Sequence, residues 1–170
     1  MWATIIAFCL VVVMVVGPIM MIQPSRRQRR VARLRELAAT RQLRVKLSSN
    51  PVSGEPRQLC VYSHAVETTS HKDKLRPWML ARQSFEHELN FVADWDWVGR
   101  NRVAEGKQRE LCEWVQMLPA PIRAVEVTEH SVSLYWTEAC WHREARWQDS
   151  IELCLNFIEH ELNWLAQMAD

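Results

Sequence analysis

The sequence predicts an α+β protein with an N-terminal transmembrane helix, a basic juxtamembrane helix, and a small, mostly antiparallel sheet covered by two helices. Three observations support this fold class. Residues 1–22 carry no Asp, Glu, Lys, Arg or His, and residues 23–46 hold nine of the 21 cations but only one acid. Residues 47–170 hold 12 cations and 19 acids and show strand-like and helix-like apolar spacing. The net charge of +1 therefore conceals a strong segregation along the chain.

The first predicted element is an uncleaved membrane anchor over residues 1–22. Its apolar run reads WATIIAFCLVVVMVVGPIMMI, and a helix of this length covers about 30 Å, the hydrocarbon thickness of a bilayer. A cleaved signal peptide would need Lys or Arg before a shorter apolar run. No cation precedes this run, and arginines follow it closely. The bias of cations towards the cytoplasm then predicts an N-terminus outside and a domain inside.

The second predicted element is a basic helix over residues 23–41. Ser25 and Gln28 have the spacing of a capping box, and Val31, Leu34 and Ala38 recur at helical spacing. Such a helix can lie on anionic lipid headgroups. The candidate headgroup contacts are Arg26, Arg27, Arg29, Arg30 and Arg33. An alternative is that these arginines only set the topology. We do not expect nucleic-acid binding, because the domain that follows is acidic.

The remaining residues, 42–170, predict one cytoplasmic α+β domain. Period-two alternation and turn residues indicate strands over 42–48, 59–65, 75–82, 93–98, 122–127 and 132–136. The last two flank a predicted hairpin turn at residues 129–131. Helical spacing of apolar residues indicates helices over 105–118 and from about His142 to Met168. Two helices on one face of the sheet follow from this order of elements.

No motif in the domain predicts catalysis, a cofactor or a metal ion. The pentapeptide EHELN occurs at 86–90 and again at 159–163, but adjacent helical residues point about 100° apart and cannot easily share one metal ion. Glu138 and His142 are four residues apart but lack further partners. Only four glycines are present, and the five cysteines show no metal-binding spacing. We therefore expect a protein that is not an enzyme, with no cofactor.

Tryptophan is unusually frequent in this sequence, with nine among 170 residues. Eight of the nine tryptophans fall in the domain, where they can fill the core or anchor a protein–protein contact. On the last predicted helix, Leu153, Phe157 and Trp164 form a second apolar stripe opposite the main one. We expect these three residues to form a partner interface. The alternative is a helix sandwiched within its own domain.

The order of segments resembles a known group of proteins. The run PSRRQRRVARLRELAATRQLRVKL after the anchor, then LRPWML, the AVEVTEHSVSLYW hairpin and the closing amphipathic helix resemble small single-pass inner-membrane proteins of gammaproteobacteria. Some of these are classed as preprotein-translocase accessory subunits of the YajC type. That type has a short Gly-rich β segment, which this sequence lacks. The resemblance implies location in the bacterial inner membrane.

These observations favour a non-catalytic accessory, assembly or scaffold subunit of a larger inner-membrane complex. Its partners would be the membrane and other subunits of that complex. The alternative is a membrane-surface module that binds anionic lipid. A third hypothesis is a small membrane-anchored enzyme with a His/Glu or Cys site.

Overall fold

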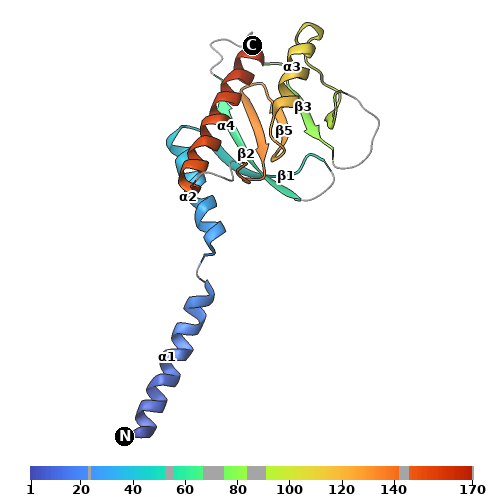
Figure 1. The fold of residues 1–170 in the computed structure, drawn as a ribbon. Coiled ribbons are helices and arrows are strands. Elements are labelled where there is room, and N and C mark those ends of the chain that lie inside the picture. The colour runs from blue at the N-terminus through green and yellow to red at the C-terminus, as the bar shows by residue number, and fades with distance from the viewer. Residues whose placement is uncertain (23, 53–55, 67–74, 84–90, 142–145, 170) are drawn as a thin grey trace. The chain divides into compact units, whose positions relative to one another are not determined.

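A computed structural model of the chain describes all residues except 23, 53–55, 67–74, 84–90, 142–145 and 170. Two compact units are present, Met1–Arg33 and Leu34–Asp170. The first unit holds helix α1 (Trp2–Ile22) and the start of helix α2 (Arg26–Thr40). The second holds the rest of α2 and everything that follows (Figure 1).

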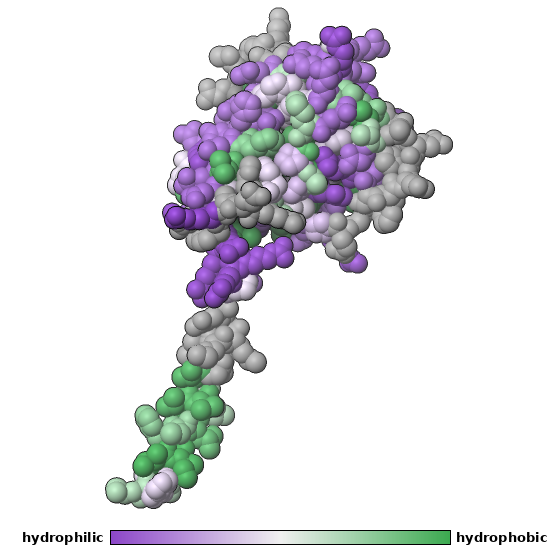
Figure 2. Space-filling view, in the orientation of Figure 1, coloured by the Kyte–Doolittle hydropathy of each residue, from purple (hydrophilic) through white to green (hydrophobic). Residues whose placement is uncertain are grey.

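The predicted transmembrane helix is a point of correction. Within the described residues, no helix is both long and apolar enough to cross a membrane. A spanning helix needs about 20 consecutive apolar residues. The transmembrane part of the predicted fold class is therefore wrong for the described part of the chain. The side chains described in α1 are exposed, and most of them are apolar (Figure 2).

Helix α2 begins where the capping box predicts. The Ser25 backbone N–H donates to Gln28 Oε1 over 2.7 Å, and the Gln28 backbone N–H donates to Ser25 Oγ over 3.2 Å. Each side chain thus satisfies a backbone donor that lacks an intrahelical acceptor. The capping box is confirmed.

The second unit is built on one six-stranded sheet in the order β1-β2-β6-β5-β3-β4. Its strands are β1 (Arg44–Ser49), β2 (Gln58–Ala65), β3 (Trp78–Arg82), β4 (Trp95–Trp97), β5 (Ile122–Val127) and β6 (Ser131–Trp136). All neighbouring strands pair antiparallel. Helices α3 (Glu105–Met117) and α4 (Trp147–Ala169) complete the unit. The described fold is therefore α+β, with one antiparallel sheet and four helices.

The main core lies between one face of the sheet and the helices. On this face, the neighbouring strands β2, β6 and β5 bury Tyr62, Leu134 and Val125 fully. Helices α3 and α4 contribute Leu111 and Leu155 to the same core, as the predicted helix stripes require. The second half of α2 also belongs to it, through buried Leu34 and Ala38. Three helical segments, rather than the predicted two, therefore cover this face.

The opposite face of the sheet carries a second, smaller cluster. Its buried members are Leu59, Val61, Ala81, Ala124 and Tyr135. The Tyr135 hydroxyl donates to Glu126 Oε2 over 2.9 Å. Val52 and Val98, from segments beside the strands, pack against the cluster. Because both faces of the central strands are covered, five consecutive residues of β2, 59–63, are buried rather than alternate ones.

Candidate binding site at the edge strand

A tight turn joins α2 to β1 and places the two elements side by side. The Gln42 N–H donates to the Ala39 carbonyl, and the Leu43 N–H donates to the Ala38 carbonyl, both over 3.1 Å. This pattern is a Schellman motif with Gln42 in the left-handed region at φ 61°. Leu43 and Ala38 are both buried, which supplies the apolar contact that accompanies the motif. The chain therefore reverses directly from helix into strand.

Strand β1 lies at one edge of the sheet. It pairs with β2 on one side, and no described strand pairs with its other side. The Asn50 N–H donates to the Arg57 carbonyl over 2.9 Å, which continues the ladder beyond β1. Because antiparallel residues alternate between bonded and non-bonded pairs, Val45, Leu47 and Ser49 direct their backbone groups away from β2. The edge thus presents three N–H donors and three carbonyl acceptors.

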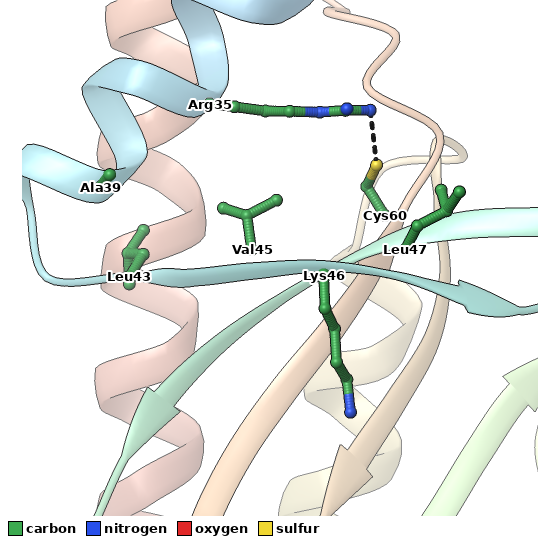
Figure 3. A pocket seen from close by; sticks show the side chains of 7 residues that line it. All are labelled: Arg35, Ala39, Leu43, Val45, Lys46, Leu47 and Cys60. Carbon is green, nitrogen blue, oxygen red and sulfur yellow. Dashed lines mark hydrogen bonds between the residues drawn. The ribbon is translucent and has the colours of Figure 1, made fainter.

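A pocket of about 260 Å³ lies between the second half of α2 and β1. Its lining residues are Arg35, Ala39, Leu43, Val45, Lys46, Leu47 and Cys60 (Figure 3). In the figure, Val45 and Leu47 project from the strand towards the side on which Arg35 lies, and Lys46 projects the opposite way. Leu47 is 58% exposed although it is apolar. The pocket is therefore an open groove with an apolar floor along an unpaired strand edge.

Two lining residues, Arg35 and Cys60, belong to a cluster of polar side chains that ties α2 to the segment after β6. Arg35 donates two hydrogen bonds, both 2.7 Å, to the two carboxylate oxygens of Glu138. Arg35 also donates to Cys60 Sγ over 2.9 Å, and the Tyr62 hydroxyl donates to Glu138 Oε1 over 2.9 Å. Glu138 has a left-handed backbone at φ 57°, and its side chain is only 8% exposed. The paired geometry holds the guanidinium rigidly in place.

The cluster also shifts the proton affinities of its members. Burial and the neighbouring Glu138 carboxylate raise the pKa of the Cys60 thiol to about 11. The same two causes raise the pKa of Tyr62 above its ordinary value, and the hydrogen bonds to Glu138 raise the pKa of Arg35. Cys60 is therefore a neutral thiol near neutral pH and a poor nucleophile. The cluster is suited to fixing structure rather than to covalent chemistry.

The other side of β1 is basic. Arg44 lies opposite Ser63 and Lys46 lies opposite Val61, so the two cations share one face of the strand. Both side chains are exposed. Among the described residues, the structure shows no ion pair for either of them. The edge therefore combines an apolar side at the groove with a cationic side on the opposite face.

The predicted partner interface on α4 is placed as follows. Trp164 stacks on Trp114 of α3, with ring centroids 4.6 Å apart and planes at 18°. Phe157 makes an edge contact with Trp141 at 5.2 Å. Leu153 is 45% exposed. The structure therefore brings Trp164 and Phe157 into internal aromatic contacts, and Leu153 is the most exposed of the three.

The predicted headgroup contacts all lie in the first unit. Arg26, Arg27, Arg29, Arg30 and Arg33 are exposed on the first half of α2. The Arg29 guanidinium donates to the Pro24 carbonyl over 3.1 Å, which holds it near the start of the helix. This stretch is among the most hydrophilic in the chain (Figure 2).

The repeated pentapeptide is only half described. Residues 86–90 lie outside the described residues, as does His142. In the second copy, Glu159 pairs with Arg41 at 3.3 Å, and buried Glu161 accepts a hydrogen bond from the Trp114 indole. No group of three or more His, Cys, Asp or Glu side chains in the described part could hold a metal ion. The second EHELN copy thus makes contacts that hold α4 to α3 and to the turn after α2.

Sequence reasoning missed the groove. Arg35 is one of nine cations in a basic stretch, and its partner Glu138 lies 103 residues away. The only local signal is the alternation of β1 itself, with Val45 and Leu47 on one side and Arg44 and Lys46 on the other. That alternation predicts a strand with two unlike faces, but not its position at the edge.

Comparison with known proteins adds no relative to this picture. No family model matches the chain, and no curated protein or solved structure is significantly similar to it.

Proposed function

We propose that the protein is a non-catalytic accessory or assembly subunit of a larger inner-membrane complex, and that its folded unit docks on another subunit. The observation that carries this proposal is the open groove between α2 and the unpaired edge of β1. Unpaired strand edges recruit extended segments of other chains, because main-chain hydrogen bonds supply affinity and adjacent pockets supply specificity. The two hydrogen bonds from Arg35 to Glu138 orient the Arg35 side chain that lines this groove.

The first unit supports the proposed location. The described side chains of α1 include exposed Ile5, Ile6, Phe8 and Leu10. Contiguous exposed apolar surface marks contact with lipid or with another protein. The five arginines that follow at the start of α2 suit the headgroup region of an anionic membrane surface.

The test is affinity purification of the tagged full chain from its native membranes in a mild detergent, followed by mass spectrometry. We expect co-purification of one defined set of membrane proteins at constant stoichiometry. A Leu153→Ala variant tests the α4 surface in the same experiment, because it truncates an exposed side chain without touching the groove. Recovery of the chain alone would contradict the proposal.

A second candidate function is binding to anionic lipid, favoured by the five exposed arginines on the first half of α2. The full chain, with Arg26, Arg27, Arg29 and Arg30 replaced by Gln, is compared with the unaltered chain on two kinds of vesicle. One kind contains anionic lipid and the other only zwitterionic lipid. Each cation near an anionic surface contributes roughly 1 kcal/mol, so the substitutions should abolish the preference for anionic vesicles. An unchanged preference would contradict lipid recognition by these arginines.

A further inference from the structure

The side chains beside the edge of β1 determine which residues would fit in a segment that docks there. A strand added to β1 would pair with the outward backbone groups of Val45, Leu47 and Ser49. Its residues opposite Val45 and Leu47 would lie over the groove, beside the apolar floor formed with Ala39 and Leu43. Apolar side chains of moderate size fit there, because exposed Leu47 leaves apolar surface uncovered.

The alternate residues of the same added strand would lie on the opposite face, beside Arg44 and Lys46. Cross-strand pairs of opposite charge stabilise a sheet, and like charges directly opposite destabilise it. Acidic residues are therefore favoured at these positions. Docking of a second copy through β1 is disfavoured, because it would gather Arg44 and Lys46 from both copies on one face of the joined sheet.

We propose that β1 accepts an extended segment of a partner protein as an added antiparallel or parallel strand, and that this segment alternates apolar with acidic side chains. The inference rests on the proposed docking function and names the partner's chemistry. Apolar residues of the segment fill the groove, acidic residues pair with Arg44 and Lys46, and the backbone completes the hydrogen bonds of the edge. Partner specificity thus comes from matching the alternating apolar and acidic residues of the segment to the apolar and cationic faces of β1.

The test uses the full chain and capped synthetic peptides of six residues, the length of β1. One peptide alternates glutamate with valine and leucine. A second carries lysine at each glutamate position, and a third has the composition of the first in an order without alternation. Binding is measured by calorimetry, and backbone amide exchange is followed by NMR. We expect the alternating acidic peptide to bind at least about tenfold more tightly than the other two.

Two variants locate the binding. Leu47→Pro removes an N–H that faces away from β2, so it blocks the added strand and leaves the ladder between β1 and β2 intact. Leu47→Ala is the matched control, because it keeps that N–H and loses only apolar contact. We expect about tenfold weaker binding for Leu47→Pro than for Leu47→Ala. The double variant Arg44→Glu with Lys46→Glu should instead prefer the lysine peptide.

Amide exchange provides the site-specific readout. The acidic peptide should slow exchange at Val45, Leu47 and Ser49 and leave the already bonded Lys46 little changed. Equal binding of all three peptides, or protection confined to α4, would overturn the inference. Protection of the three outward amides in the free chain would show that the edge is already covered. Loss of a dimer on Leu47→Pro substitution would assign the edge to a second copy instead.

The two proposals fail separately. If the native-membrane purification recovers a partner complex equally well with Leu47→Pro, the docking function stands and the role of β1 is overturned. If the acidic peptide binds as expected but no partner is recovered, the edge chemistry stands and the subunit function is overturned.

Discussion

Gln42 occupies a backbone conformation that favours glycine. At φ 61° it holds the left-handed position of the Schellman motif that turns α2 into β1. An L-residue there costs about 1–2 kcal/mol, and glycine has no such cost. Its side chain is exposed. The short turn that builds one end of the groove therefore contains a strained residue.

We predict that Gln42→Gly raises the free energy of unfolding by about 0.5–1 kcal/mol, since the relief of strain exceeds the extra entropy of the unfolded chain. Gly99→Ala is the matched control. Gly99 has φ +85°, and an added Cβ would meet nothing within 4 Å, so only its backbone conformation is tested. That variant should lose stability. Urea denaturation measures both, and a loss in Gln42→Gly would contradict the assignment of strain.

Helices α3 and α4 are joined by more than apolar packing. Trp164 stacks on Trp114, whose indole N–H donates to buried Glu161. Near the N-terminus of α3, Lys107 Nζ donates to the Met168 carbonyl over 2.7 Å. A cation at this position satisfies a carbonyl at the C-terminus of α4, which has no intrahelical partner. The second apolar stripe of α4 thus contributes to the fold.

On α4, Trp164 packs within the fold, whereas Leu153 is exposed and open to a partner. We predict that Trp164→Ala lowers the free energy of unfolding by about 2–3 kcal/mol, because it removes a ring that is stacked and partly buried. Leu153→Ala should change it by no more than about 0.5 kcal/mol, since that side chain is exposed. Thermal and urea unfolding of the two variants measure the difference. Equal effects would show that Trp164 is not an element of the helix–helix contact.

At the scale of the whole molecule, the described part of the second unit buries one thiol and two phenols whose pKa values are raised, those of Cys60, Tyr62 and Tyr135. Burial raises the pKa of Cys60 to about 11 and raises those of Tyr62 and Tyr135 above their ordinary values. A glutamate carboxylate beside each group adds to the shift. In the unfolded chain these groups release their protons near their ordinary values, 9.0 for the thiol and 10.0 for the phenols. At alkaline pH, the folded state therefore keeps protons on these groups that the unfolded state releases.

We predict that stability falls as pH rises above about 9, because the contribution of these groups is complete below the ordinary pKa and is lost towards the folded value. Each group contributes at most about 1.4 kcal/mol per pH unit. Tyr62→Phe keeps the ring beside Trp136, at a centroid distance of 5.3 Å, and removes one proton. It should flatten the slope above about pH 10, the ordinary pKa of a phenol, in urea titrations carried to about pH 11. An unchanged slope would contradict burial of a protonated Tyr62.

Much of the described fold follows from local patterns. The apolar spacing of α3 and α4, the capping box of α2 and the turn between β5 and β6 depend on residues a few positions apart. The Thr128 N–H indeed donates to the Ser131 carbonyl over 2.8 Å across that turn. Such features are set by near neighbours in the chain, so they can be predicted without knowing the fold. The resemblance to inner-membrane proteins, the orientation and the absence of an enzymatic activity stay predictions.

By itself, the sequence determined the order of elements, the segregation of charge and which side chains share a face. The tertiary structure decided which strand lies at the edge, which helices cover the sheet and that Arg35 meets Glu138. The physical reason is that local backbone preferences depend on neighbouring residues, whereas strand order depends on contacts between distant segments. The groove beside β1 depends on strand order, so only the folded chain reveals it.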